Sequence, residues 1–133
     1  MPLLRRLLWI DCTAGAVVGV AVLALSAWLS ALEGLPRGVL LATGAANLLY
    51  ASFSFSLAIR PVRPVHLIQR LAVANMAWAP VCLGLAAAFA GSVTPFGVLH
   101  LVGEAVFVGG LGALEWRHRH RLATAAAPRR PGT

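Results

Sequence analysis

Apolar residues fill four long blocks of this chain, and most charged side chains lie between or outside them. The blocks are residues 7–32, 39–59, 67–90 and 95–116. Each reaches the roughly 20 residues that a helix needs to cross about 30 Å of hydrocarbon. Because they are continuously apolar, they do not resemble the alternating strands of a membrane β-barrel. The pattern predicts an all-α integral membrane protein with four transmembrane helices.

The connections between the blocks favour a four-helix bundle. Residues 33–38, 60–66 and 91–94 are short, so helices that are neighbours in sequence are expected to pack antiparallel. We expect this helical domain to cover residues 1–121. Residues 122–133 are rich in alanine, proline and arginine without periodicity, and we expect a mobile cytoplasmic tail there.

A short pattern occurs twice. P-x-G-V-L-x-x-x-G spans residues 36–44 and again 95–103, each time at the start of an apolar block. Duplication of a two-helix unit would give a 2+2 repeat with a pseudo-twofold axis along the membrane normal. Chance is the other interpretation, because glycine, valine and leucine are abundant throughout the chain.

Composition agrees with a membrane location, and arginine placement predicts an orientation. The chain is 59% hydrophobic and 11% charged, against about 25% charged residues in soluble domains. Every arginine except Arg37 would lie on one side, and the positive-inside rule makes that side, with both termini, cytoplasmic. The absence of lysine, together with abundant alanine and arginine, is typical of a GC-rich bacterial genome, and we expect the protein in the bacterial inner membrane. These arginines should attract anionic lipid headgroups. Without interleaved aromatic residues they do not suggest nucleic acid: Arg5, Arg6, Arg60, Arg63, Arg70, Arg117, Arg119, Arg121, Arg129 and Arg130.

Polar residues inside the apolar blocks mark the candidate site, because they are costly there and need partners. The last block carries Glu104 near the predicted bilayer midplane, with His100 one turn away. In the second block, helical spacing places Asn47 and Tyr50 on one face, and in the third block it places Asn75 and Trp78 on one face. The predicted intramembrane site is therefore Glu104, His100, Asn47, Asn75, Tyr50 and Trp78.

Two interpretations of Glu104 stay open. An ionised carboxylate at that depth costs several kcal/mol unless it is paired, so it needs a partner, a proton or water. Glu104 is either a proton-coupled or cation-binding group with His100 as a second titrating group, or a structural residue. In the structural case it would be hydrogen-bonded to Asn47, Asn75 or His100 and would tie helices together.

The sequence also predicts ion pairs at the cytoplasmic edge. Asp11 and Glu115 lie near that boundary, and we expect them to pair with Arg70 or Arg117. A bis-histidine haem would require a second histidine at the depth of His100 on another helix, and the sequence offers none. We therefore expect neither a metal nor another cofactor. No catalytic motif occurs, which favours a protein that is not an enzyme.

Several of these residues together resemble a family of small four-helix bacterial inner-membrane proteins to which no activity is assigned. The resemblance covers all four helices and implies a four-helix fold in a bacterial inner membrane. It implies no particular reaction. Small multidrug transporters have a similar length but carry their essential glutamate in the first helix. Here the midplane acid lies in the fourth, which leaves drug efflux unsupported. The resemblance is carried by Asp11, Gly34-Leu35-Pro36, Tyr50, Asn75-x-x-Trp78 and Thr94-x-x-Gly97.

Three functions remain as hypotheses. The leading hypothesis is a small accessory or oligomerising subunit of a membrane assembly, favoured by the lack of catalytic motifs, the short connections and small residues that permit close helix contacts. The second is a proton-coupled transporter of small solutes that uses Glu104. The third is a protein that binds a quinone or another lipophilic ligand near Tyr50 and Trp78. The small residues are Gly15 and Gly19 in the first block and Ala105, Gly109 and Ala113 in the last.

Overall fold

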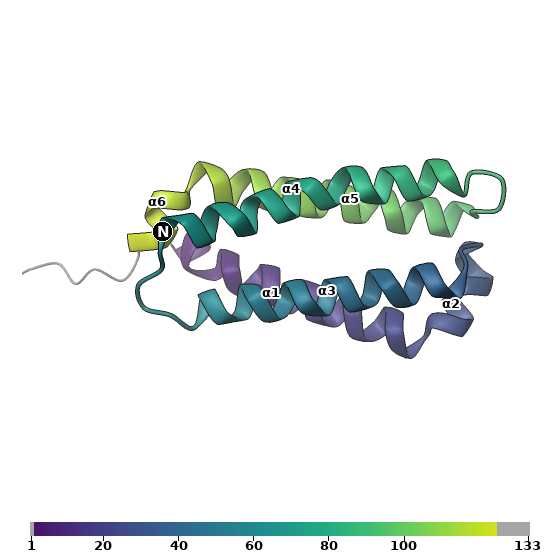
Figure 1. The fold of residues 1–133 in the computed structure, drawn as a ribbon, viewed down its shortest axis with the longest axis horizontal. Coiled ribbons are helices and arrows are strands. Elements are labelled where there is room, and N and C mark those ends of the chain that lie inside the picture. Colours follow the sequence, from purple (N-terminus) through teal and green to yellow (C-terminus); the bar gives the residue numbers. More distant parts are fainter. Residues whose placement is uncertain (1, 125–133) are drawn as a thin grey trace, which may run out of the picture.

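The computed structural model describes residues 2–124, and the side chains of residues 6–123, as helices and short connections without strands. Four of the helices, α1, α3, α4 and α5, are long and apolar enough to cross a membrane. This confirms the all-α prediction, and the last three spans differ from their predicted bounds by no more than two residues. The elements are α1 Pro2–Ala24, α2 Ser26–Glu33, α3 Arg37–Ala58, α4 Val65–Ala88, α5 Pro95–Arg117 and α6 Arg119–Thr124 (Figure 1).

The first apolar block, predicted as one helix over 7–32, is two helices. The chain bends at Leu25, between α1 and α2, although backbone hydrogen bonds continue on both sides of it. The bend turns α2 against the starts of α3 and α5, so tertiary contacts override the uniform hydropathy of the block. Ser26 at the bend accepts a hydrogen bond of 3.0 Å from Nε of Arg37.

The long helices form two hairpins. The first consists of α1 and α3 and the second of α4 and α5, and packing is much closer within each hairpin than between them. The connections lie at alternate ends of the molecule (Figure 1). We call the end with α6 and the α3–α4 connection the arginine end, and the end with α2 and the α4–α5 connection the loop end. The repeated pattern at 36–44 and 95–103 opens the second helix of each hairpin.

Glycines set the close approach within the hairpins. A Cβ added to Gly112 of α5 would lie 2.8 Å from the carbonyl oxygen of Ala72 and 2.7 Å from Cγ of Met76, both on α4. In the first hairpin, Gly15 and Gly19 face α3 at similarly short range. The glycines of α1 therefore serve contacts inside the bundle.

The α4–α5 connection closes the loop end by capping α2. Gly34 ends that helix with φ of 70°, a conformation that favours glycine. The amide of Thr94 donates to the carbonyl of Glu33 at 2.9 Å, and the hydroxyl of Thr94 donates to Leu32 at 2.6 Å. Ser92 donates to the carbonyl of Gly34 at 3.0 Å. These bonds satisfy the free carbonyls of the helix end and join the two hairpins.

Arg63 closes the arginine end. Its guanidinium donates to the carbonyls of Leu57 and Ala58, at the end of α3, at 2.5 and 3.0 Å. A third bond of 2.9 Å reaches the carbonyl of Leu122 in α6. A planar fork with five donors suits three converging carbonyls. Burial lowers the pKa of Arg63, although arginine keeps its charge at any physiological pH.

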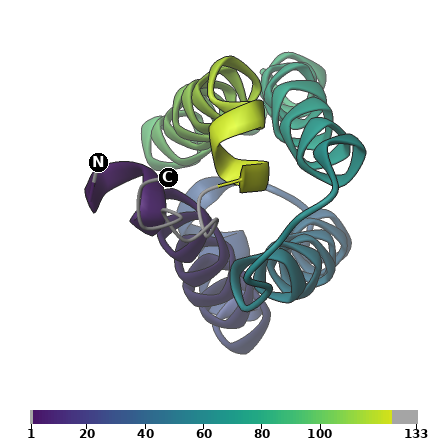
Figure 2. The same ribbon diagram turned by 90° about the vertical axis from the view of Figure 1, so that its left-hand side faces the viewer.

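Helix α6 extends the helical domain to Thr124, past its predicted end at residue 121. Leu122 is 1% exposed and packs in the core with Leu8, Leu57 and Leu71. Viewed along the bundle, α6 lies across the arginine end (Figure 2). The remainder of the predicted tail, 125–133, lies outside the described residues.

Replacing Gly112 with alanine should destabilise the protein by about 1–3 kcal/mol, because the new methyl group would overlap α4. The control is Gly110→Ala on the same helix, which meets nothing within 4 Å. Alanine favours a helix over glycine by about 0.5–1 kcal/mol, so Gly110→Ala should be neutral or stabilising. Thermal unfolding in detergent measures both variants. Equal melting temperatures would contradict the packing described.

Replacing Arg63 with lysine should loosen α6, because an ammonium group cannot hold three carbonyls in one plane. The loss of a charged hydrogen bond worth about 1.5 kcal/mol should speed amide exchange across residues 119–124 about tenfold. Arg60→Lys is the matched control, because Arg60 is exposed. Hydrogen exchange followed by mass spectrometry measures the rates. Unchanged exchange in both variants would contradict a role of the Arg63 hydrogen bonds in holding α6.

Candidate functional site

All four acidic residues of the chain turn into the bundle. Asp11 of α1, Glu33 of α2 and Glu115 of α5 are 3%, 5% and 0% exposed, and the side chain of Glu104 in α5 is 10% exposed. In the described part of the chain, the only ion pairs of these acids are with His100. Most carboxyl groups of the interior are therefore stabilised by neutral hydrogen-bond donors.

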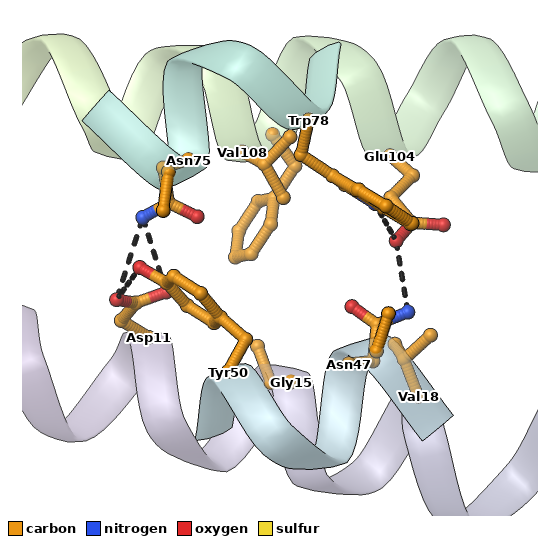
Figure 3. Close-up of a pocket in the computed structure, with 13 residues that line it drawn as sticks. Asp11, Gly15, Val18, Asn47, Tyr50, Asn75, Trp78, Glu104 and Val108 are labelled. Carbon is orange, nitrogen blue, oxygen red and sulfur yellow. Dashed lines mark hydrogen bonds between the residues drawn. The ribbon is translucent and has the colours of Figure 1, made fainter. Parts of the chain in front are cut away.

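The first group of polar side chains surrounds Glu104. Its Oε1 accepts hydrogen bonds from Nδ2 of Asn47 at 3.0 Å and from Nε1 of Trp78 at 2.9 Å (Figure 3). Its Oε2 lies 3.2 Å from Nε2 of His100. Asn47 belongs to α3 and Glu104 to α5, so the carboxyl group joins the two hairpins. We call Glu104, Asn47, Trp78, His100 and Glu33 the Glu104 cluster.

His100 stands between two carboxyl groups. While Nε2 faces Glu104, Nδ1 lies 2.7 Å from Oε1 of Glu33. Both ring nitrogens donate only when the imidazole is protonated, so this arrangement suits a charged histidine. Burial raises the pKa of Glu33, and the neighbouring His100 opposes that effect.

Sequence reasoning missed Glu33, which it left in a connection beside Arg37. Glu33 is the last residue of α2, and the bend at Leu25 carries it to α5. The available signal was Gly34, a helix-ending residue that follows the acid directly. Nothing in the spacing of the chain, however, pointed to His100 as its partner.

The second group surrounds Asp11. Its Oδ2 accepts hydrogen bonds from the hydroxyl of Tyr50 at 2.7 Å and from Ser54 at 3.2 Å. Nδ2 of Asn75 lies 3.4 and 3.5 Å from the two oxygens of Asp11 (Figure 3). The same nitrogen lies 3.1 Å from Oε2 of Glu115. One amide group of α4 thus serves two carboxyl groups, from α1 and α5. We call these five residues the Asp11 cluster.

The ion pairs predicted at the cytoplasmic edge were wrong. The side chains of Arg70 and Arg117 are exposed, and in the described part of the chain no arginine lies within pairing distance of Asp11 or Glu115. Burying an arginine beside them would require stripping water from its guanidinium. Asn75 instead supplies the hydrogen bonds as an uncharged donor.

The two clusters are built alike. Each central acid receives a hydrogen bond from an aromatic side chain of its own hairpin, Tyr50 for Asp11 and Trp78 for Glu104. Each also receives one from an asparagine of the other hairpin. Figure 3 shows these two polar bridges on either side of an open space between the hairpins. The bridges hold the hairpins together without filling the space.

A cavity of about 200 Å³ lies between the clusters. For comparison, an engineered apolar cavity of about 150 Å³ accepts benzene. Five of the six predicted site residues line this cavity, and His100 acts on it through Glu104. The polar lining is Asp11, Asn47, Tyr50, Asn75, Trp78 and Glu104, and the apolar lining is Ala14, Gly15, Val18, Ala46, Ala74, Phe107 and Val108.

No protein-family model, curated protein or solved structure matches this chain. The family resemblance therefore rests on the residues quoted for it. The fold itself defines the class. Over residues 2–124 the protein is all-helical with four apolar helices, consistent with a multi-pass membrane protein, and it contains a cavity whose polar lining includes Asp11 and Glu104.

The hydrogen bond from Trp78 to Glu104 can be measured by a double-mutant cycle. Trp78→Phe should destabilise the protein by about 1 kcal/mol, and by much less when Glu104 is already methionine. Trp28→Phe is the control, because Trp28 is 60% exposed and should not couple to Glu104. Chemical or thermal unfolding in detergent gives the four free energies. An additive cycle would mean that the bond does not contribute.

Proposed function

We propose that this protein is a proton-coupled transporter of a small solute and that the cavity is its substrate site. The observation that carries the proposal is a cavity inside the bundle with a carboxyl group at each end. Protein interiors are closely packed, and hydrogen bonds that only tie helices together need no cavity beside them. Glu104 is the proposed group at which solute and proton exchange.

A chain of titratable groups supports proton coupling. Glu33, His100 and Glu104 follow one another from the loop end to the cavity, separated by 2.7 and 3.2 Å. A histidine between two carboxyl groups can pass a proton from one nitrogen while accepting one at the other. This chain gives protons a route between the loop end and the substrate.

The Asp11 cluster supplies titratable groups on the other side of the cavity. Two carboxyl groups, of Asp11 and Glu115, face a single amide nitrogen of Asn75. Two ionised carboxylates so arranged in apolar surroundings repel each other, which favours binding of a proton or a cation. The cavity therefore has proton-exchanging groups toward both ends of the bundle.

The connections between the hairpins support alternating access. Both ends are closed, by the caps on α2 at the loop end and by Arg63 with α6 at the arginine end. Between them the hairpins meet through two apolar clusters and through the two polar clusters beside the cavity. Rocking of one hairpin against the other would open one end at a time, as in transporters built from repeated units. We place the arginine end in the cytoplasm, in a bacterial inner membrane.

The subunit hypothesis keeps one supporting observation. A Cβ added to Gly103 or Gly110 of α5 would meet no other part of the bundle within 4 Å, so these glycines leave an outer face where another helix could approach closely. That face is compatible with transport, since a transporter can also be an oligomer. A neutral quinone fits less well, because it carries no positive charge to complement the carboxyl groups of the cavity.

Glu104→Gln should abolish proton uptake driven by a solute gradient in proteoliposomes, because the amide cannot exchange a proton. Thr13→Val is the control, a polar-to-apolar change on α1 whose side chain is exposed. A pH-sensitive dye inside the vesicles measures the uptake, and melting temperatures show that both variants fold. Wild-type uptake in the Glu104→Gln protein would sink the proposal.

A further inference from the structure

We propose that the cavity binds a small organic cation, an amine with an apolar body, whose ammonium group meets Glu104. Transport of such a ligand rests on the proposed function, whereas its binding to the cavity does not. The charge of the cavity, its wall chemistry, the partner of Glu104 and the cavity volume each support this ligand class.

Charge excludes anions and disfavours neutral solutes. Among the described residues that line the cavity, the acidic side chains are Asp11 and Glu104, and no arginine or histidine is among them. An anion would meet two carboxyl groups of its own sign. A neutral solute would add no charge that complements them, whereas a cation would.

Wall chemistry distinguishes an organic cation from a metal ion. Calcium and magnesium need six or more oxygen ligands close together. Between its polar ends, the cavity is lined by Val18, Phe107, Val108 and small residues that offer no such oxygens. Tyr50 and Trp78 add aromatic rings, which attract organic cations. An ammonium group on an apolar body matches these surroundings.

The partner of Glu104 favours that end of the cavity for the ammonium group. Asp11 takes its hydrogen bonds from three neutral side chains, those of Tyr50, Ser54 and Asn75. Oε2 of Glu104, in contrast, lies 3.2 Å from Nε2 of His100, a group that can give up a proton. Arrival of the ammonium would release the proton of His100 through Glu33 to the loop end. One positive charge enters the site and one leaves it, so the exchange is electroneutral.

The groups that govern this exchange come from several elements. His100 is faced by Glu33 of α2 and by Glu104 of its own helix, and Glu104 is held by Asn47 of α3 and Trp78 of α4. From α1, Asp11 faces the same cavity at its other end. Acidification should therefore weaken amine binding, since protons and the amine compete for one set of carboxyl groups.

Volume limits the body of the ligand. A cavity of about 200 Å³ exceeds by a little the roughly 150 Å³ that accepts benzene. One ring with a short aminoalkyl chain fits that volume. Phenethylamine, which is positively charged at neutral pH, is a suitable probe, and 2-phenylethanol and 3-phenylpropionate are its neutral and anionic analogues.

The experiment is equilibrium binding of these three probes to the full-length protein in lipid nanodiscs by calorimetry. We expect phenethylamine to bind at least about tenfold more tightly than 2-phenylethanol, and phenylpropionate not to bind. Glu104→Gln should bring the amine down to the affinity of the alcohol, while the control Thr13→Val should leave it unchanged. If Glu104→Gln fails to fold, the wild-type series still decides.

Absence of amine binding, or equal or tighter binding of the alcohol or the acid, would overturn the inference. That result would leave transport of another solute standing if proton uptake depends on Glu104. Amine binding without any proton-linked flux would have the opposite meaning. It would support the ligand class and contradict the proposed transport, so the two claims fail separately.

Discussion

The burial of four carboxyl groups is the constraint on which this structure depends. A carboxyl group inside an apolar bundle needs hydrogen-bond donors or a proton to offset the hydration that it loses on burial. Asp11 and Glu104 obtain their donors from both hairpins. The same bonds therefore hold the hairpins together and keep them apart, and the cavity lies between the two sets of bonds. Stability and the candidate site have one physical origin.

The distribution of charge follows from the same constraint. Carboxyl groups lie inside with neutral donors, while exposed arginines such as Arg70 and Arg117 stay where their guanidinium groups remain hydrated. Arg63 differs from these exposed arginines, because its guanidinium donates hydrogen bonds to three backbone carbonyls at the arginine end. An interior with negative groups and no arginine at its cavity is suited to protons and organic cations. These two ligands compete for one site, and competition is the physical basis of coupled exchange.

The sequence contained the helices and much of the site, because both follow from local periodicity. Block length predicted the spans, and helical spacing placed Asn47, Tyr50, Asn75 and Trp78 on inward faces with Glu104. What it lacked were relations between distant segments. The bend at Leu25 depends on tertiary contacts that uniform hydropathy hides, and without it Glu33 cannot be placed beside His100. The choice of Asn75 over an arginine as partner of Asp11 likewise depends on burial, which charge alone does not reveal.

The most direct measurement is the proton released when an amine binds to the purified protein in a weakly buffered solution. Competition for the interior carboxyl groups predicts close to one proton per bound phenethylamine near neutral pH, and none with 2-phenylethanol. If amine binding releases no proton at any pH from the range where carboxyl groups titrate to the range where histidine titrates, protons and amines do not compete for the same groups. The polar clusters would then be structural, and coupling through Glu104 would have to be abandoned.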